Sequence, residues 1–267
     1  MYLANAGMSV FAGIRKQQDG ARLEEDGRGR IQSILLDVTD DESIEIARRE
    51  ERAVGGSGLG GLVNNAGIGG FGPLEHITRQ ELEQMFEVNV YGVVLTTKAF
   101  LPLLRRARGR VVNVGGGGAG RVAIPLMGVG CASKFAVEGM TDALRVELRR
   151  AGVRVSLVEP GMTYSEADKL VFRESMNAGL NAAVERIPEE ERDYYGPPLE
   201  RLRAFNLAML KAAAPPEKVA SRIHHALTAR RPRSRYWCGR ESKVVALFDR
   251  VATAGARDAV WGLITGL

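Results

Sequence analysis

Short apolar runs alternate with longer segments of helical spacing, and this alternation limits the folds open to the chain. The apolar runs, rich in β-branched residues, cover residues 8–14, 31–36, 59–63, 110–114 and 153–158. Helical spacing covers residues 41–52, 79–106, 129–150 and 216–229. Runs this apolar are typical of strands buried on both faces of a parallel sheet. The pattern therefore predicts an α/β fold in which crossover helices cover a parallel sheet.

Length and cysteine content narrow the class of protein. A chain of 267 residues with 45% hydrophobic content can bury one sizeable core, so we expect a single domain, residues 1–267. Cys131 and Cys238 are too few for a disulfide framework or a zinc set, which indicates a reducing compartment and no metal. The N-terminus lacks the pattern of a signal peptide, and no apolar run reaches the roughly 18 residues that cross a bilayer. We expect a cytoplasmic protein.

Basic residues outnumber acidic ones, giving a formal charge of +5. Part of the excess lies at Arg-rich helix ends, residues 105–108 and 149–150, where a cation suits the helix dipole. The densest cluster, residues 230–235, has no recognisable nucleic-acid module around it. We therefore expect no nucleic-acid partner.

Two segments depart from the alternation. Residues 166–214, with Pro188, Gly196 and charged stretches, are expected to form short helices and loops after a strand. Such insertions shape the ligand cleft of parallel sheets, so the segment is either a substrate lid or a surface excursion. Residues 243–267 carry apolar helical stripes, which either dock on the protein itself or lie on a membrane surface.

Three motifs carry a resemblance to a known family. Asn64-Asn65-Ala66-Gly67 follows the third apolar run, Lys134 lies on a later helix, and Asn89 lies between them. This arrangement resembles the classical short-chain dehydrogenase/reductase (SDR) family from Leu3 to about Gly239. The resemblance implies a Rossmann-type, doubly wound parallel sheet in a three-layer αβα arrangement.

The resemblance also implies a nicotinamide dinucleotide cofactor. In the family the Asn-Asn-Ala-Gly motif steadies the central sheet and lines the adenine ribose, an aspartate lies near the adenine, and a Pro-Gly turn lies beneath the nicotinamide. The matching residues here are Asp37, Val38, Asn64, Ala66, Gly67, Lys134, Pro160, Gly161 and Ser165, the last near a threonine that contacts the carboxamide. Arg15 follows the first apolar run, where a cation suits the 2′-phosphate of NADP, so we expect NADP over NAD.

The catalytic residues of the family are incomplete in this chain. Its signature is Tyr-x-x-x-Lys, and here Gly130 stands four residues before Lys134. The family's serine falls at Gly117 or Gly118, whereas Asn89 matches the asparagine that holds a proton-relay water. A missing positioned acid costs roughly 10²- to 10⁴-fold in rate, and a missing oxyanion donor a comparable factor. We therefore expect impaired chemistry, and Tyr91, Cys131 and Tyr164 are better explained by packing or surface positions than as substitutes.

The family's first strand and its glycine-rich phosphate turn have no counterpart in the sequence. Residues 2–7 resemble the end of the helix that follows that turn. The absent strand belongs at the sheet centre, so we expect six strands with a gap between residues 8–14 and 59–63. A misassigned start or a truncation accounts for this better than a fold that omits the strand, since two core strands lose their pairing.

Residues 10–15 and 235–239 resemble the branch of the family that includes steroid and retinol dehydrogenases. This implies an apolar secondary alcohol or ketone as substrate. Helices 79–106 and 129–150 match the pair that forms the family's dimer interface, so a homodimer or homotetramer is expected. Three functions stay open: an NAD(P)-dependent oxidoreductase, a pseudoenzyme that binds a ligand or an active relative, and a non-redox enzyme.

Overall fold

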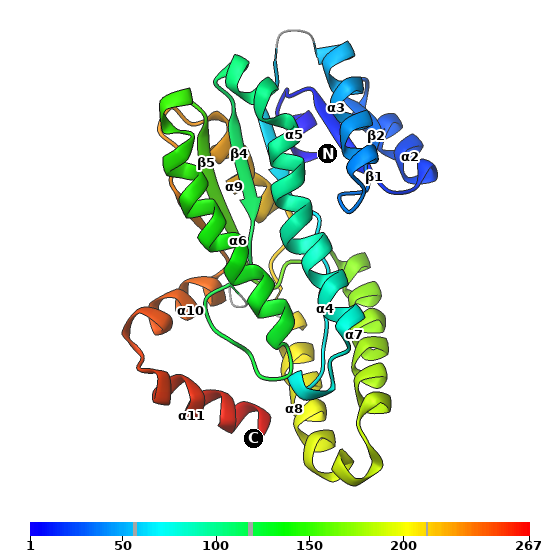
Figure 1. The fold of residues 1–267 in the computed structure, drawn as a ribbon, viewed down its shortest axis with the longest axis vertical. Coiled ribbons are helices and arrows are strands. Elements are labelled where there is room, and N and C mark those ends of the chain that lie inside the picture. Colours follow the sequence, from blue (N-terminus) through cyan, green and yellow to red (C-terminus); the bar gives the residue numbers. More distant parts are fainter. Residues whose placement is uncertain (56–57, 117–119, 212) are drawn as a thin grey trace.

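The computed structural model describes residues 1–55, 58–116, 120–211 and 213–267 (Figure 1). Its strands are β1 (Val10–Ile14), β2 (Ile31–Leu35), β3 (Gly61–Asn64), β4 (Arg110–Val114), β5 (Arg154–Pro160) and β6 (Arg235–Cys238). The longer helices are α2 (Gln17–Gly27), α3 (Asp41–Gly55), α4 (Arg79–Phe86), α5 (Gly92–Ala107), α6 (Gly128–Glu147), α7 (Glu166–Arg186), α8 (Arg192–Lys211), α9 (Glu217–Thr228), α10 (Arg240–Val251) and α11 (Ala254–Thr265). Short helices are α1 (Tyr2–Asn5), η1 (Leu74–His76), η2 (Glu87–Tyr91), η3 (Arg149–Ala151) and η4 (Glu189–Glu191).

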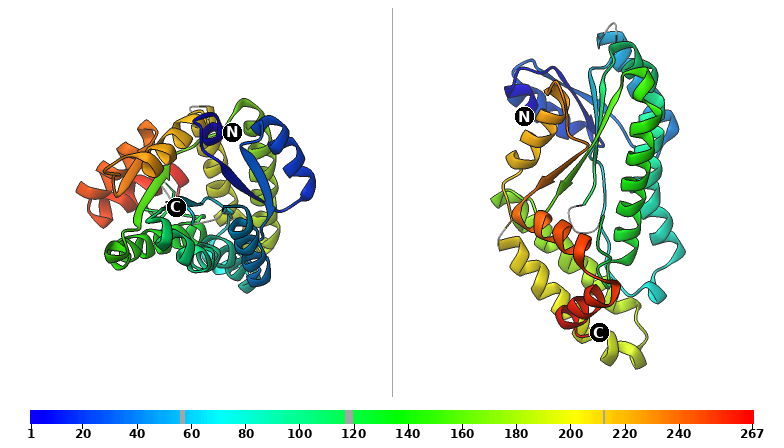
Figure 2. Two further views of the ribbon diagram at one scale, coloured as in Figure 1. Left: turned by 90° about the horizontal axis from the view of Figure 1, so that it is seen from above. Right: turned by 90° about the vertical axis from the view of Figure 1, so that its left-hand side faces the viewer.

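All strands pair in parallel, but in two separate sheets. β1 pairs with β2, and β3, β4, β5 and β6 pair in that order. Helices α5 and α6 cover one face of the larger sheet and α9 covers the other (Figure 2). No strand among the described residues lies between β1 and β3. The predicted three-layer α/β fold and the predicted gap at its centre are both confirmed.

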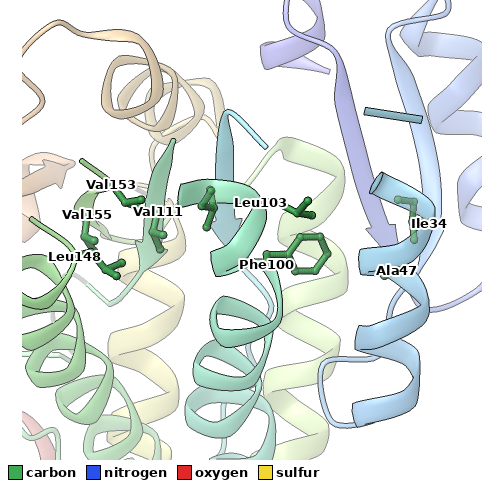
Figure 3. Close-up of a cluster of buried hydrophobic side chains, with 9 residues drawn as sticks. Ile34, Ala47, Phe100, Leu103, Val111, Leu148, Val153 and Val155 are labelled. Carbon is green, nitrogen blue, oxygen red and sulfur yellow. The ribbon is translucent and has the colours of Figure 1, made fainter. Parts of the chain in front are cut away.

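Side-chain packing joins the two sheets where strand pairing does not. Ile34 on β2 and Ala47 on α3 share one buried cluster with Phe100 and Leu103 on α5. Figure 3 shows Phe100 and Leu103 between that pair and Val111 on the larger sheet. Hydrophobic burial on α5 therefore holds the β1–β2 unit in place.

Residues at the chain's start form the helix end that the sequence predicts. Helix α1 covers Tyr2–Asn5, and Ala4 is buried. The Tyr2 ring meets the ring of His224 on α9 edge-on, with centroids 6.2 Å apart. Contact with α9 places α1 on the face of the larger sheet opposite α5 and α6.

The inserted segment differs from its prediction. Residues 166–214 form two long helices, α7 and α8, rather than short helices and loops. They pack together around a cluster of their own that includes Met176, Leu180, Leu199 and Leu202. Amphipathic burial within this hairpin outweighs the helix-breaking tendency of the two prolines in α8.

The C-terminal helices dock partly on the protein. Trp261 on α11 meets Phe205 on α8 edge-on, with ring centroids 5.9 Å apart. On α10, Val244, Leu247 and Val251 stay exposed. Among the residues described, no helix is long and apolar enough to cross a membrane.

Candidate active site

The site begins at a break in the helix expected over residues 79–106. A capping box of Thr78 and Glu81 starts α4. The chain then forms the π-helical turn η2, which contains Asn89, before α5 continues. Such π-turns arise inside α-helices, often at functional sites, and here the turn places the Asn89 side chain in the core, 1% exposed.

Asn89 ties the loop after β3 to α6. Its Nδ2 donates to the carbonyl of Ile68 and to Ser133 Oγ, both at 2.9 Å. Its Oδ1 accepts from the Ile68 amide at 2.8 Å. With every polar atom of its amide bonded, Asn89 fixes the position of this loop beside the helix that carries Lys134.

Lys134 lies next to Asn89 across Gly67. Its Nζ donates to the Val114 carbonyl at 3.4 Å, and burial lowers the pKa of this ammonium. A Cβ at Gly67 would lie 3.2 Å from Asn89 Oδ1 and 3.3 Å from Lys134 Nζ. The glycine of the Asn-Asn-Ala-Gly motif therefore lets Lys134 and Asn89 approach the same stretch of backbone.

Gly130 leaves an open position one helical turn before Lys134. Its carbonyl accepts from Ser133 Oγ at 2.7 Å, and apart from the neighbouring residues and backbone of α6 itself nothing lies within 4 Å of where a Cβ would stand. The predicted serine positions, Gly117 and Gly118, lie outside the described residues. Where the family's tyrosine would stand, α6 therefore offers space and no proton donor.

The three side chains considered as substitutes do not join this cluster. Tyr91 is about half exposed, 49%. Cys131 is buried, which raises the pKa of its thiol, and its Sγ accepts from the Ile124 amide at 3.4 Å. Tyr164 stacks on Phe172 with ring centroids 4.5 Å apart, and burial raises its pKa. Within the described part of the chain, none of the three is hydrogen-bonded to Asn89 or Lys134.

Asn64 holds the sheet rather than the reacting centre. Its Nδ2 donates to Thr97 Oγ1 at 2.9 Å and to Asn113 Oδ1 at 2.8 Å. Asn113 Nδ2 in turn donates to Thr141 Oγ1 on α6 at 2.9 Å. This buried network links β3, β4, α5 and α6, the steadying role that the resemblance implies. Ala66 follows in the exposed part of the loop.

Arg15 and Asp37 follow β1 and β2 at the same edge of the small sheet. Asp37 Oδ1 accepts from the Thr39 amide at 2.9 Å, the main cause of the lowered pKa of this carboxyl, while Arg15 contributes less. Asp37 does not cap the helix that follows, because Asp40 Oδ1 accepts from the Glu42 amide there. Arg15 is exposed and free to meet a ligand. Adjacent Val38 packs against Gly92 on α5.

Pro160, Gly161 and Ser165 follow β5. Pro160 ends the strand, and the Gly161 amide donates to the Cys238 carbonyl at 2.9 Å. Ser165 Oγ accepts from the Asp168 amide at 3.1 Å and so caps α7. This capping role explains a serine at position 165, and its contact with a carboxamide stays a prediction.

The sequence does not reveal an apolar pocket lined by Ile68 and Met85, two residues that contact Asn89. Its volume is about 190 Å³, and its walls come from the loop after β3, from α4, from the start of α6 and from α7. Ile68, Phe71, Met85 and Leu126 supply apolar surface, and Arg186 is held by Glu81 at 2.9 Å. The lid segment thus forms one wall of a cavity beside the site, a contact that local sequence patterns do not encode.

A buried ion cluster lies further along α6 and was also missed. Arg235 lies 2.9 Å from Glu159, 2.5 Å from Glu138 and 2.6 Å from Asp142. Burial, followed by repulsion from Glu138, raises the pKa of Glu159 to about 7. Gly130, Lys134, Glu138 and Asp142 recur every four residues, a stripe on one helix face that could have revealed the cluster.

Comparisons with known proteins decide the family. The sequence profile described as short chain dehydrogenase matches residues 1–175. The chain belongs to the short-chain dehydrogenase/reductase family. Human short-chain dehydrogenase/reductase family 9C member 7 is 38% identical over 91% of this chain and 77% of its own length. Mouse retinol dehydrogenase 5 is 36% identical over 97% of this chain and 82% of its own length, which supports the predicted branch.

Other relatives show how widely the family's substrates vary. Rat mitochondrial D-beta-hydroxybutyrate dehydrogenase is 37% identical over 88% of this chain and 71% of its own length. Among solved structures, a Streptomyces avermitilis short-chain dehydrogenase superposes with a TM-score of 0.75 over 99% of this chain and 88% of its own, at 24% identity. That likeness confirms the α/β fold.

Proposed function

We propose that this SDR protein is by descent an NAD(P)-dependent oxidoreductase for an apolar secondary alcohol or ketone, with impaired chemistry. Gly130 carries the proposal, because it leaves an open space one turn before the half-buried Lys134. Retained Lys134 and Asn89 support descent from an oxidoreductase. The vacant acid position supports the loss of rate.

A nicotinamide cofactor fits the residues that converge on the carboxyl ends of the strands. A metagenomic SDR solved with NADP is 30% identical, with a TM-score of 0.56 over 60% of this chain and 74% of its own. Here Lys134 Nζ has three N–H donors and only one described acceptor, at 3.4 Å, so two donors are available for a ribose. Such a cofactor, when bound, supplies hydride transfer. We favour NADP because Arg15 is an exposed cation directly after β1, where the family resemblance leads us to expect the 2′-phosphate.

The chain's own residues can bind and orient but cannot replace the acid. Asn89 hydrogen-bonds to Ile68 and so positions the loop after β3, and Lys134 Nζ can donate a hydrogen bond to a ribose hydroxyl. Among the described residues, no tyrosine hydrogen-bonds to Asn89 or Lys134, and Gly130 itself has no side chain. A substrate oxygen bound there would draw its proton from water, which is slower than transfer from a positioned acid.

The pocket beside the site supports an apolar substrate. Ile68, Phe71, Met85 and Leu126 face the cavity of about 190 Å³, whose one cation, Arg186, is already paired with Glu81. An apolar ring or chain would bury against these side chains, whereas a small hydroxy acid would find no free charge among the lining residues described.

Two glycine substitutions on α6 test the proposal. Gly130→Tyr places a phenol one turn before Lys134, and we expect NADPH-dependent reduction of a steroid ketone or retinaldehyde to rise at least tenfold over the unmodified chain. Gly139→Tyr is the matched control, because its Cβ would also meet nothing within 4 Å on the same helix, away from Lys134. Equal rates in the two variants, or rapid turnover by the unmodified chain, would refute the proposal.

A pseudoenzyme is the alternative function, favoured by the same glycine. In that case the chain binds a cofactor or an apolar ligand without turnover, or partners an active relative. Two results together would support the pseudoenzyme over the disabled oxidoreductase. Calorimetry would show that the ligand binds, and Gly130→Tyr would still give no ketone reduction.

A further inference from the structure

A groove lined by arginines lies at the end of the sheet opposite the candidate active site. Its volume is about 980 Å³, and its cationic residues are Arg108, Arg110, Arg145, Arg149, Arg154 and Arg231. We call this set the arginine groove. Arg110 and Arg154 are the first residues of β4 and β5, whereas Lys134 contacts the last residue of β4 (Figure 1). The two sites therefore occupy opposite edges of the sheet.

Backbone carbonyls hold three arginines of the groove in place, and only one of the three, Arg145, also pairs with a carboxylate among the described residues. Arg110 donates to the Ala226 carbonyl at 2.8 Å, Arg154 donates to the Arg230 carbonyl, and Arg145 donates to the Val155 carbonyl at 3.2 Å. These bonds fix guanidinium groups from three elements without neutralising them. Preorganised guanidinium forks are suited to phosphate oxygens.

Positive charge in the groove is largely unbalanced. Arg145 pairs with Asp142 at 2.7 Å, whereas Arg108, Arg110, Arg149, Arg154 and Arg231 form no ion pair with any described residue. Burial lowers the pKa of Arg110, and the charge of neighbouring Arg154 lowers it further. A helix dipole accounts for cations after α5 and α6, but not for those that begin β4 and β5.

We propose that the arginine groove binds a ligand carrying several phosphate groups close together. Five unpaired arginines match about three phosphates at −1.5 to −2 each, and the groove has the volume of a small-molecule site. Its lining contains no aromatic side chain on which a nucleotide base could stack, which favours clustered phosphates over a single-stranded nucleic acid. This site is independent of the oxidoreductase function proposed above.

Calorimetry on the full chain tests the groove, with tripolyphosphate as the probe and orthophosphate for comparison. We expect tripolyphosphate to bind more tightly, and added salt to weaken it. Arg149→Glu and Arg231→Glu should each weaken binding at least tenfold, because each replaces an exposed, unpaired cation with an anion. Arg173→Glu, an exposed residue on α7, is the charge-matched control and should leave binding unchanged.

Vesicles distinguish a soluble ligand from a lipid headgroup with the same chemistry. If the chain binds phosphatidylcholine vesicles that contain phosphatidylinositol bisphosphate and Arg149→Glu abolishes this binding, the proposed site is supported and its ligand is a lipid headgroup. If tripolyphosphate binds but the vesicles do not, the proposed site is supported and its ligand is soluble. The proposal is wrong if tripolyphosphate does not bind, if Arg173→Glu weakens binding as much as Arg149→Glu, or if only phosphatidylserine vesicles or duplex DNA bind.

Discussion

Among single residues, Asn89 contributes most to holding the site together. It bonds both backbone polar groups of Ile68 and also Ser133, from within a π-turn of the chain. The family resemblance predicts a functional asparagine at this position. An asparagine inside a helix also needs hydrogen-bond partners. The identity of those partners does not follow, because Ile68 and Ser133 come from distant elements that only the folded chain brings together.

Removing the Asn89 side chain should destabilise the fold. Asn89→Ala leaves the partly buried amide and carbonyl of Ile68 without their partner, at a cost of about 1–3 kcal/mol in the free energy of unfolding. Urea unfolding followed by circular dichroism measures this cost. Asn65→Ala is the control, since Asn65 is exposed in the same loop. Equal stabilities of the two variants would contradict the assigned role.

Glu159 should give the stability a pH dependence. Its pKa is raised from 4.5 to about 7 in the folded chain, mainly by burial, so the folded state holds this proton more tightly than the unfolded state. The resulting stabilisation is fully present below about pH 4.5 and is lost as the pH rises through about 7.

Glu159→Gln should flatten this dependence between pH 4.5 and 7, because glutamine does not titrate. Urea unfolding at a series of pH values measures the slope, and Glu190→Gln, at an exposed position, serves as the control. A slope unchanged in Glu159→Gln would show that Glu159 is ionised throughout this range.

At the scale of elements, the divided sheet is the main feature. Strands and the gap between residues 8–14 and 59–63 follow from apolar runs together with the family resemblance. The long α7–α8 hairpin does not follow, because its prolines indicate turns while its stability comes from a core that the two helices form together. The apolar pocket was missed for the same reason, since α7 forms one wall of it.

The free edge of β1 should be visible by hydrogen exchange. The Val10 amide donates to the residue before β2, and the Ile14 carbonyl accepts from the residue after β2. Strand alternation therefore turns the amides of Phe11 and Gly13 toward the gap. We expect these two amides to exchange faster than that of Val10, measured by NMR. Equal protection would mean that another strand, from a second chain for example, closes the gap.

In the molecule as a whole, some of the features expected to recognise the cofactor are found among the described residues and one is not. We propose that Arg15 and Lys134 bind a dinucleotide, but no glycine-rich turn precedes β1 among the described residues, and such turns supply amides for a pyrophosphate. This division follows from the sequence, whereas the packing of Phe100 and Leu103 that joins the two sheets does not.

The cofactor should bind weakly and with a preference for NADP. Calorimetry should give a lower dissociation constant for NADPH than for NADH, and Arg15→Glu should weaken NADPH binding about tenfold or more, because a charged contact to the 2′-phosphate is lost. Arg22→Glu, exposed on α2, should change neither constant. Tight and equal binding of both nucleotides would contradict the proposed role of Arg15.

We propose that glycine at position 130, together with glycine at the serine position, disables an oxidoreductase site that retains Lys134 and Asn89. The most direct measurement is NADPH-dependent ketone reduction by a chain given an added N-terminal strand and glycine-rich turn, with and without Gly130→Tyr and a serine at Gly117 or Gly118. We predict that the substitutions raise the rate at least a hundredfold, since both the acid and the oxyanion donor return. Rapid reduction by the extended chain without them would contradict the claim.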